Sequence, residues 1–146
     1  MAVSGNIASW LIDSALTAGA GGKVALREGH RTWTYDELAD RVGRLSSALR
    51  TLQLSKRDRV VILMRDTLEA AAAILGAMHA GAVAVPISEL STPGDVQQRV
   101  HHSGACIAIT DAAHESIFDA IRGETPAMRE VVCVEAKLPS SHDFDA

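Results

Sequence analysis

Arg65, Asp66 and Glu89 are the best local candidates for contact with a ligand, because they lie just beyond apolar runs that are typical of strands. Ligands of open α/β sheets usually bind outside the carboxyl ends of the strands. Asp66 has a second explanation, since Asp66-Thr-Leu-Glu69 is a capping-box pattern that starts a helix. For Arg65 and Glu89 we expect a salt bridge, on the surface or between subdomains, rather than a substrate contact.

The six histidines give no metal site. His101 and His102 are adjacent, but neighbours in a helix point about 100° apart, and no cysteine or carboxylate cluster completes a ligand set. We expect this pair at a solvated helix end. His79 lies near the end of an alanine-rich helix, where an imidazole can meet the free carbonyls. His30 is expected in a hairpin turn.

Neither a phosphate loop nor a nucleophile is recognisable in the sequence. Such a loop follows a strand and opens a helix, whereas Gly19-Ala-Gly-Gly22 follows a predicted helix and precedes a strand, as a connector does. No GxxxxGK[ST] sequence occurs, and Met64-Arg-Asp66 lacks the glycines of a dinucleotide-binding turn. A GxSxG elbow is missing around the serines at 46, 47, 88 and 91. We therefore predict no catalytic, cofactor-binding or metal-binding residue in this chain.

Composition narrows the class of protein. The 146 residues are 47% hydrophobic and 22% charged, which is typical of one globular unit. The net charge of −4 and the scattered basic residues argue against nucleic acid as a partner. Residues 68–87 form the one stretch apolar enough to suggest a membrane span, but Glu69, His79, Gly81 and Pro86 interrupt it, so we expect a buried helix and strand.

Cysteine usage and the start of the chain favour a cytoplasmic location. Cys106 and Cys133 sit inside apolar runs without CxxC spacing, so we expect buried free thiols in a reducing compartment. Residues 1–9 lack the basic and apolar regions of a secretory signal.

Four short apolar runs are the predicted strands that would position the candidate residues. They are residues 59–64, 82–86, 105–110 and 130–134, and each gap between them has room for one helix. Regular alternation of this kind predicts successive βαβ units, and hence an α/β fold with a mostly parallel sheet covered by helices on both faces.

Capping residues predict the helix boundaries between these strands. Gly81 ends the first helix, and Thr92-Pro93 opens a second helix that ends at Gly104. The last helix is expected to begin near Asp111 and to stop at Gly123.

The first 57 residues predict a different arrangement. Residues 6–17 fit an amphipathic helix, and residues 23–27 and 31–33 fit a hairpin with a turn at Gly29-His30. Thr34-Tyr-Asp-Glu37 is a capping box that opens a long helix with leucine and valine at spacings of three and four. We divide residues 1–134 into this part (1–57) and the βαβ repeats (58–134), followed by a polar tail over residues 135–146.

Two strings resemble core motifs of the adenylate-forming (AMP-binding) enzymes. Arg31-Thr-Trp-Thr-Tyr-Asp-Glu-Leu38 looks like the first motif, and Ile74-Leu-Gly-Ala-Met-His-Ala-Gly-Ala-Val-Ala-Val-Pro86 is similar to the second. The elements between and after them occur in the family's usual order, so the resemblance runs from about residue 6 to 145. It is to the N-terminal part of an acid–CoA ligase. Residues 6–13 and 23–27 look most like the benzoate, or aryl acid, branch.

The resemblance implies a two-step reaction in the full-length enzyme. ATP and a carboxylate, with Mg²⁺, give an acyl-adenylate and pyrophosphate, and CoA then displaces AMP to form a thioester. The family's phosphate loop ending in Pro-Lys-Gly, its ribose-binding acid, its hinge and its catalytic lysine have no counterpart in these residues. We therefore expect a fragment that supplies scaffold to the remainder of a ligase chain and is inert alone.

One alternative function class stays open: a silent interaction or regulatory module that retains the scaffold and regulates or pairs with an active ligase. An exposed apolar face on its sheet or helices would favour self-association.

Overall fold

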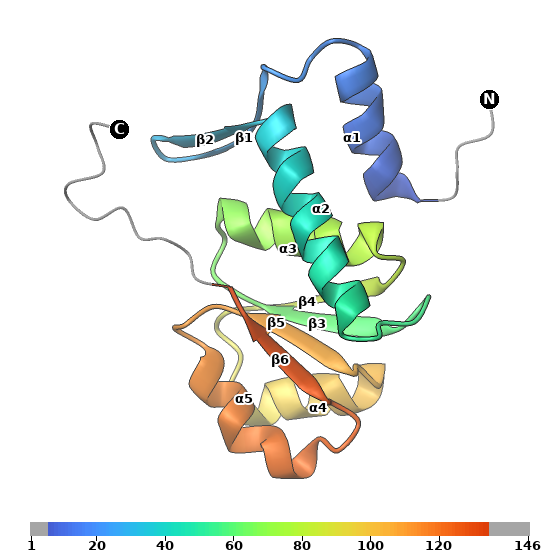
Figure 1. The fold of residues 1–146 in the computed structure, drawn as a ribbon. Helices are drawn as coiled ribbons and strands as arrows, with labels where there is room; N and C mark the ends of the chain where they lie inside the picture. The colour runs from blue at the N-terminus through green and yellow to red at the C-terminus, as the bar shows by residue number, and fades with distance from the viewer. Residues whose placement is uncertain (1–5, 135–146) are drawn as a thin grey trace.

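The structure, a computed structural model, describes residues 6–134 (Figure 1). The predicted polar tail, residues 135–146, lies outside the described residues. The elements follow in the order α1 (Ile7–Thr17), β1 (Val24–Glu28), β2 (Arg31–Thr34), α2 (Tyr35–Thr51), β3 (Arg59–Leu63), α3 (Leu68–His79), β4 (Val83–Ile87), α4 (Pro93–Ser103), β5 (Ile107–Thr110), α5 (Glu115–Ile121), a 3₁₀ turn (Arg122–Glu124) and β6 (Glu130–Cys133).

The described residues form one parallel sheet and one separate hairpin. The sheet has the strand order β4-β3-β5-β6, with Val61 of β3 opposite Val85 on one side and Ala108 on the other. The three strand pairings within this four-stranded sheet are all parallel, which confirms the predicted βαβ units. β1 and β2 pair antiparallel, as predicted, and their turn places Gly29 at a φ of 55°.

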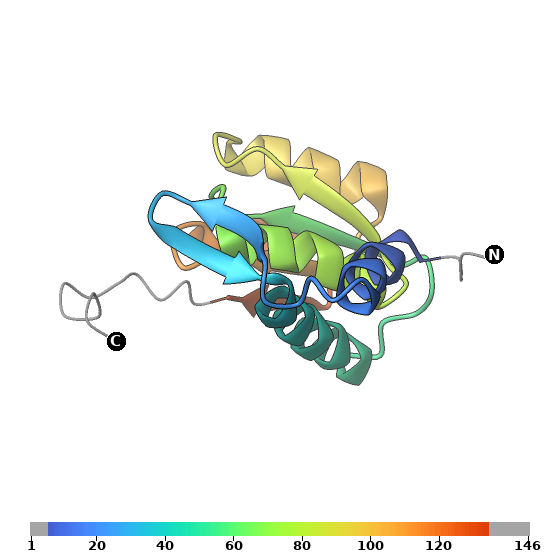
Figure 2. The same cartoon turned by 90° about the horizontal axis from the view of Figure 1, so that it is seen from above.

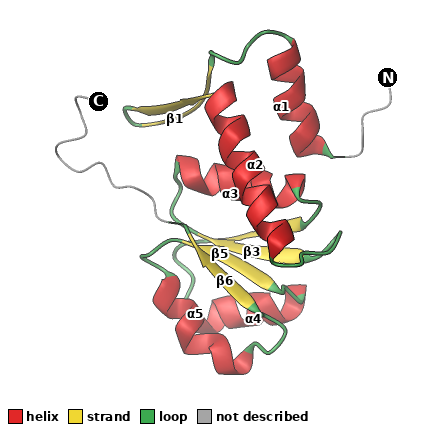
Figure 3. Ribbon diagram, in the orientation of Figure 1, coloured by secondary structure: helices red, strands yellow, loops and turns green. Residues whose placement is uncertain are grey.

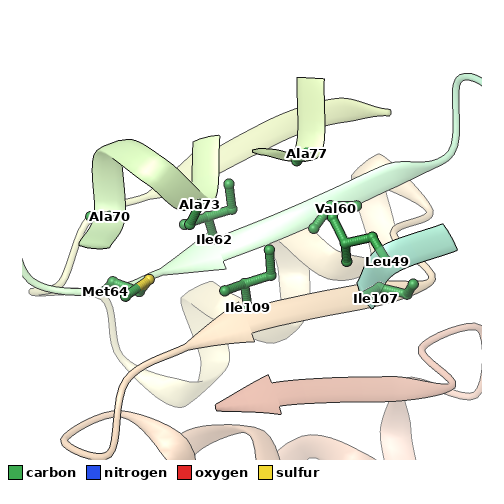
Figure 4. Packing of buried hydrophobic residues seen from close by; sticks show 9 residues of the cluster. All are labelled: Leu49, Val60, Ile62, Met64, Ala70, Ala73, Ala77, Ile107 and Ile109. Atoms are coloured by element: carbon green, nitrogen blue, oxygen red, sulfur yellow. The ribbon is translucent and has the colours of Figure 1, made fainter. Parts of the chain in front are cut away.

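Helices cover both faces of the sheet, with α2 and α3 on one side and α4 and α5 on the other (Figure 3). Alternate residues of β3 supply the two cores, because successive strand residues point to opposite faces. Val60 and Ile62 pack under α3 and against Leu49 of α2 (Figure 4). Val61 and Leu63 pack on the opposite face with Val96, Val100 and Phe118 from α4 and α5.

A third cluster joins the first part of the chain to this layer. Ile12 of α1, Trp33 of β2, Leu38 and Val42 of α2, and Leu68 of α3 are buried together. Seen from above, the hairpin lies beside α3 (Figure 2). The amphipathic helices predicted for residues 6–17 and from Thr34 onward therefore direct their apolar faces into this cluster.

Most predicted helix boundaries are confirmed. Thr34 and Thr92 form reciprocal capping boxes with Glu37 and Asp95, and Pro93 opens α4. Gly104 adopts the left-handed conformation expected of a helix stop, with a φ of 63°.

Two boundaries were predicted wrongly. Thr67, and not Asp66, caps α3, because its hydroxyl accepts the N–H of Ala70 while Asp66 stays exposed. The last helix starts at Glu115 rather than near Asp111, and it ends at Ile121 in a 3₁₀ turn that contains Gly123. The start moves because Asp111 is held in the loop by other hydrogen bonds, described below.

Gly76 allows α3 to approach α2 closely. A Cβ atom added there would lie 2.7 Å from Cδ2 and 3.0 Å from Cβ of Leu45. Gly43, in α2, has open space where its Cβ would be. Both glycines lie inside helices, but only at Gly76 does the packing of a neighbouring helix require the absence of a side chain.

We predict that Gly76→Ala destabilises the protein by about 1 kcal/mol, because overpacking outweighs the gain of about 1 kcal/mol that alanine normally brings to a helix interior. Gly43→Ala should instead be neutral or stabilising by up to about 1 kcal/mol, since only the propensity term applies. Urea unfolding followed by circular dichroism measures both free energies. Equal stabilisation by the two variants would contradict the close approach.

Candidate functional site

The carboxyl ends of β3 and β5 are where ligand contacts were predicted. These strands are neighbours, yet α3 leaves β3 toward one face and α5 leaves β5 toward the other. The loops after them therefore diverge, which is the topological switch point at which open α/β sheets commonly bind ligands. Arg65 follows β3 and Asp111 follows β5, so the two side chains meet at this position.

Asp111 is the centre of the polar network at the switch point, and only 1% of its surface is exposed. Its Oδ2 accepts the backbone N–H of Arg65 at 3.2 Å and the Nε–H of the same residue at 3.1 Å. Its Oδ1 accepts the N–H of Ala113 at 3.1 Å and lies 2.6 Å from Nδ1 of His114. Both carboxylate oxygens are thus occupied by groups of this chain.

The electrostatics of Asp111 follow from these contacts. Burial acts to raise the pKa of its carboxyl group, but the hydrogen bonds from His114 and from the backbone and side chain of Arg65 outweigh burial and lower the pKa to about 2. The carboxylate stays ionised at neutral pH. It therefore suits the anchoring of two loops and is unsuited to proton transfer near pH 7.

The predicted candidates at this edge separate into different roles. Arg65 forms a salt bridge, as expected, although within the βαβ part and not between subdomains. Asp66 is exposed, and Glu89 lies in an exposed turn after β4. The sequence reasoning missed Asp111 and His114; the available signal was that Asp111 follows its strand at the same edge as Arg65.

A second polar cluster connects the hairpin to α3. Arg31 of β2 forms ion pairs with Glu69 of α3 and, at 3.2 Å, with Glu28 of β1. Glu28 also accepts the N–H of Leu68 at 3.0 Å, at the first turn of α3. Burial acts to raise the pKa of Glu69, and the hydrogen bond from Arg31 outweighs it, so the net shift is downward. Glu69 was predicted to act with Asp66 in a capping box; in the structure its largest favourable interaction is the cross-element ion pair with Arg31.

His79, His101 and Ser46 make contacts within the chain. Nδ1 of His79 lies 3.1 Å from the hydroxyl of Ser46 on α2, so its imidazole meets a side chain rather than the carbonyls that were predicted. Nε2 of His101 lies 2.8 Å from the carbonyl oxygen of Glu124. Within residues 6–134, no three His, Cys, Asp or Glu side chains are grouped so that they could hold a metal ion.

The Gly19–Gly22 segment does not fit the phosphates of ATP. It connects α1 to β1, as predicted. A Cβ atom added at Gly21 would lie 2.5 Å from Oδ1 of Asp36, so the carboxylate of Asp36 faces this segment closely. A carboxylate at that position repels phosphate oxygens. At the switch point, Arg65 is already engaged by Asp111. Within residues 6–134, neither the Gly19–Gly22 segment nor Arg65 therefore offers a cradle for ATP.

No helix within the described part of the chain combines the length and the apolar character that crossing a membrane requires.

Comparison with known proteins identifies the family. Residues 14–145 match the family described as AMP-binding enzyme, and the chain therefore belongs to the AMP-binding enzymes. This confirms the resemblance carried by the two core motifs.

Within this family the chain is similar to aryl acid–CoA ligases. It is 36% identical over 128 residues to the benzoate–CoA ligase of Thauera aromatica, covering 87% of this chain and 24% of that relative. A crystal structure of a benzoate CoA ligase from Burkholderia xenovorans LB400 has 33% identity and a TM-score of 0.78 over 87% of this chain and 25% of that one.

The similarity also extends to an isolated domain. The inhibitor-bound N-terminal domain of FACL13 from Mycobacterium tuberculosis has 25% identity and a TM-score of 0.77, and the match covers 88% of this chain and 33% of that domain. The chain thus spans about a quarter of the length of the ligases it matches. The predicted fold, an N-terminal subdomain of the adenylate-forming enzymes, is confirmed.

We predict that Asp111→Asn lowers the free energy of unfolding by about 2 kcal/mol at pH 7, the value that corresponds to a pKa of about 2 in the folded state against an ordinary 3.8. Because the folded pKa is depressed, this stabilisation is complete above about pH 4 and is lost as the pH falls toward 2. The difference between variant and wild type should therefore shrink over that range in urea unfolding experiments.

Asp119→Asn is the matched control, since its carboxylate is 68% exposed and 3.8 Å from Arg122. It should change stability by less than about 0.5 kcal/mol. A loss at Asp111 that did not vary with pH would contradict the ionised network.

Proposed function

We propose that this chain supplies part of the N-terminal domain of an ATP-dependent aryl acid–CoA ligase. The observation that carries the proposal is the match of residues 14–145 to the AMP-binding enzymes, together with 36% identity to a benzoate–CoA ligase. The overall reaction joins a carboxylic acid to CoA through an acyl-adenylate. Carboxylate and ATP give acyl-adenylate and pyrophosphate, and the CoA thiol then displaces AMP.

The role of these residues in that reaction is to build and brace a wall of the domain. Asp111 and Glu69, the buried carboxylates at its two polar clusters, are both engaged by arginines of the same chain. ATP, Mg²⁺ and CoA are proposed as ligands of the full-length enzyme, held by residues outside this chain. The substrate is proposed to be a small, aromatic carboxylic acid, and the location to be the cytoplasm.

A chimeric enzyme tests the scaffold role. Residues 6–134 would replace the corresponding segment of the Thauera aromatica benzoate–CoA ligase, and thioester formation would be measured with ATP, CoA, benzoate, hydroxybenzoates and fatty acids. The chimera should form benzoyl-CoA, because the segment contributes fold rather than reacting groups. A folded chimera without activity would overturn the proposal. The 146-residue chain alone should show no turnover, and turnover by it would equally refute a scaffold role.

An exposed apolar surface on α1 favours a partner for this chain. Ile7, Trp10 and Leu11 share one face of the helix, at spacings of three and four, and are 62%, 48% and 42% exposed. In the proposed ligase, the remainder of the enzyme covers this face. In the alternative function, an interaction module, a second copy would cover it.

We predict that the isolated chain self-associates through α1 and that Trp10→Asp with Leu11→Asp restores a monomer. Light scattering coupled to size-exclusion chromatography gives the mass, and Leu90→Asp is the control, since Leu90 is 88% exposed but lies in a separate turn. A monomeric wild-type chain at high concentration would contradict self-association through α1.

A further inference from the structure

An apolar groove of about 310 Å³ lies between α2 and α3, beside the end of β6. We call it the α2–α3 groove. Its apolar lining consists of Trp33, Leu45, Ala48, Ala72, Ala73 and Val134. Small-molecule sites in proteins commonly have volumes of roughly 300–1,000 Å³ and a mostly apolar lining. The groove therefore has the size and the character of a site for a compact ligand.

Contacts between the two helices form this groove without a ligand. Leu45 of α2 packs on Gly76 of α3, where an added Cβ atom would lie 2.7 Å from Cδ2 of Leu45. The hydroxyl of Ser46 lies 3.1 Å from Nδ1 of His79 at the end of α3. These contacts set the spacing of the helices, and the short side chains of the three alanines leave the space between them open. A ligand would therefore bind without the cost of ordering the helices.

Two arginines of α2 line the groove beside its apolar residues. Arg41 lies over the ring of Trp33, 4.1 Å from its centroid, and it forms no ion pair with a carboxylate within residues 6–134. The guanidinium of Arg44 lies 2.9 Å from the carboxylate of Asp40, but both side chains are exposed, and an exposed pair of this kind is weak. The ring contact thus holds one cation at the groove, and a second cation is within reach of it.

Glu69 is the acidic residue among those that line the groove. Its carboxylate is paired with Arg31 from the hairpin, so its charge is compensated and it is not available as a base. The remaining side chains of the lining are aliphatic, aromatic or cationic, and they include no nucleophile. The groove is therefore suited to holding an anion with an apolar body and unsuited to reacting with it.

We propose that the α2–α3 groove binds a small monocarboxylate, with the apolar body of the ligand against the alanines and its carboxylate toward Arg41 and Arg44. Charge complementarity supports this occupant, because the cations lie beside an apolar floor. A protein partner is disfavoured, since the cores of protein interfaces are depleted of charged residues and such a partner would have to desolvate Arg44 and Asp40. The proposal does not depend on the ligase function.

A titration of the 146-residue chain followed by nuclear magnetic resonance tests the site. In a Trp10→Phe background, the indole N–H signal of Trp33 reports on the groove. Benzoate or hexanoate should shift this signal with a Kd on the order of 1 mM, as expected for so few atoms. The neutral amides, benzamide and hexanamide, should bind about fivefold more weakly, because they lack the charge. The tighter acid identifies the body as aromatic or aliphatic. Equal affinities of acids and amides, or no shift at all, would overturn the proposal.

Variants at the groove locate the binding. Ala48→Leu fills the space and should weaken binding roughly tenfold, because the ligand loses its apolar contacts. Ser47→Leu is the matched control, since Ser47 is also exposed on α2 but does not line the groove. Arg44→Gln should weaken binding of the acid about threefold and leave the amide unaffected. Arg122→Gln, at an exposed arginine that is likewise paired with an aspartate, should change neither. Equal effects of Ala48→Leu and Ser47→Leu would overturn the proposal.

Dilution without ligand distinguishes a small molecule from a second copy of the chain. The Trp33 signal should stay constant as the protein is diluted, because the groove is proposed to be open to solvent in the free chain. A shift of this signal on dilution, matched by a fall in mass in light scattering, would assign the groove to a second copy and would overturn the proposal.

Discussion

Burial of β3 on both faces is the constraint on which the rest of the structure depends. Val60, Val61, Ile62 and Leu63 are each 3% exposed or less, and β4 and β5 flank the strand on either side. A strand in this position needs one helix layer above it and one below it. The order β4-β3-β5-β6 satisfies that need, because α3 crosses one face while α4 and α5 cross the other.

The same constraint explains the polar network at the switch point. The sheet ends at Leu63 and Thr110, where backbone groups leave their ladders in a buried setting and must find partners. Thr110 donates its hydroxyl to the carbonyl oxygen of Leu63 at 2.9 Å, and Asp111 accepts the N–H of Arg65. Asp111 thus replaces ladder hydrogen bonds at the point where the two loops diverge. Its low pKa is a consequence of that structural role.

Sequence patterns predicted local structure well and contacts between elements poorly. The capping box at Thr34, the glycine stop at Gly104 and the order of strands and helices depend on residues close together in the chain, so a single sequence contains the information. The pairs Arg31–Glu69 and Arg65–Asp111 are separated by 38 and 46 residues. The residues around Glu69 do not reveal whether its carboxylate pairs with Arg31 or helps to cap its own helix. The capping box of Asp66 with Glu69 was therefore predicted wrongly.

Arginines at the opposite, amino edge of the sheet show why scattered basic residues need not indicate a ligand site. Arg59 donates to the carbonyl oxygens of Ser103 and Gly104 at the end of α4, and Arg50 donates to that of His79 at the end of α3. Helix C-termini carry unpaired carbonyls and partial negative charge, so a guanidinium there satisfies both. In a doubly covered parallel sheet these helix ends gather at the amino edge by topology. The fold therefore places the positive charges of this region, which supports the proposed role of the chain as scaffold.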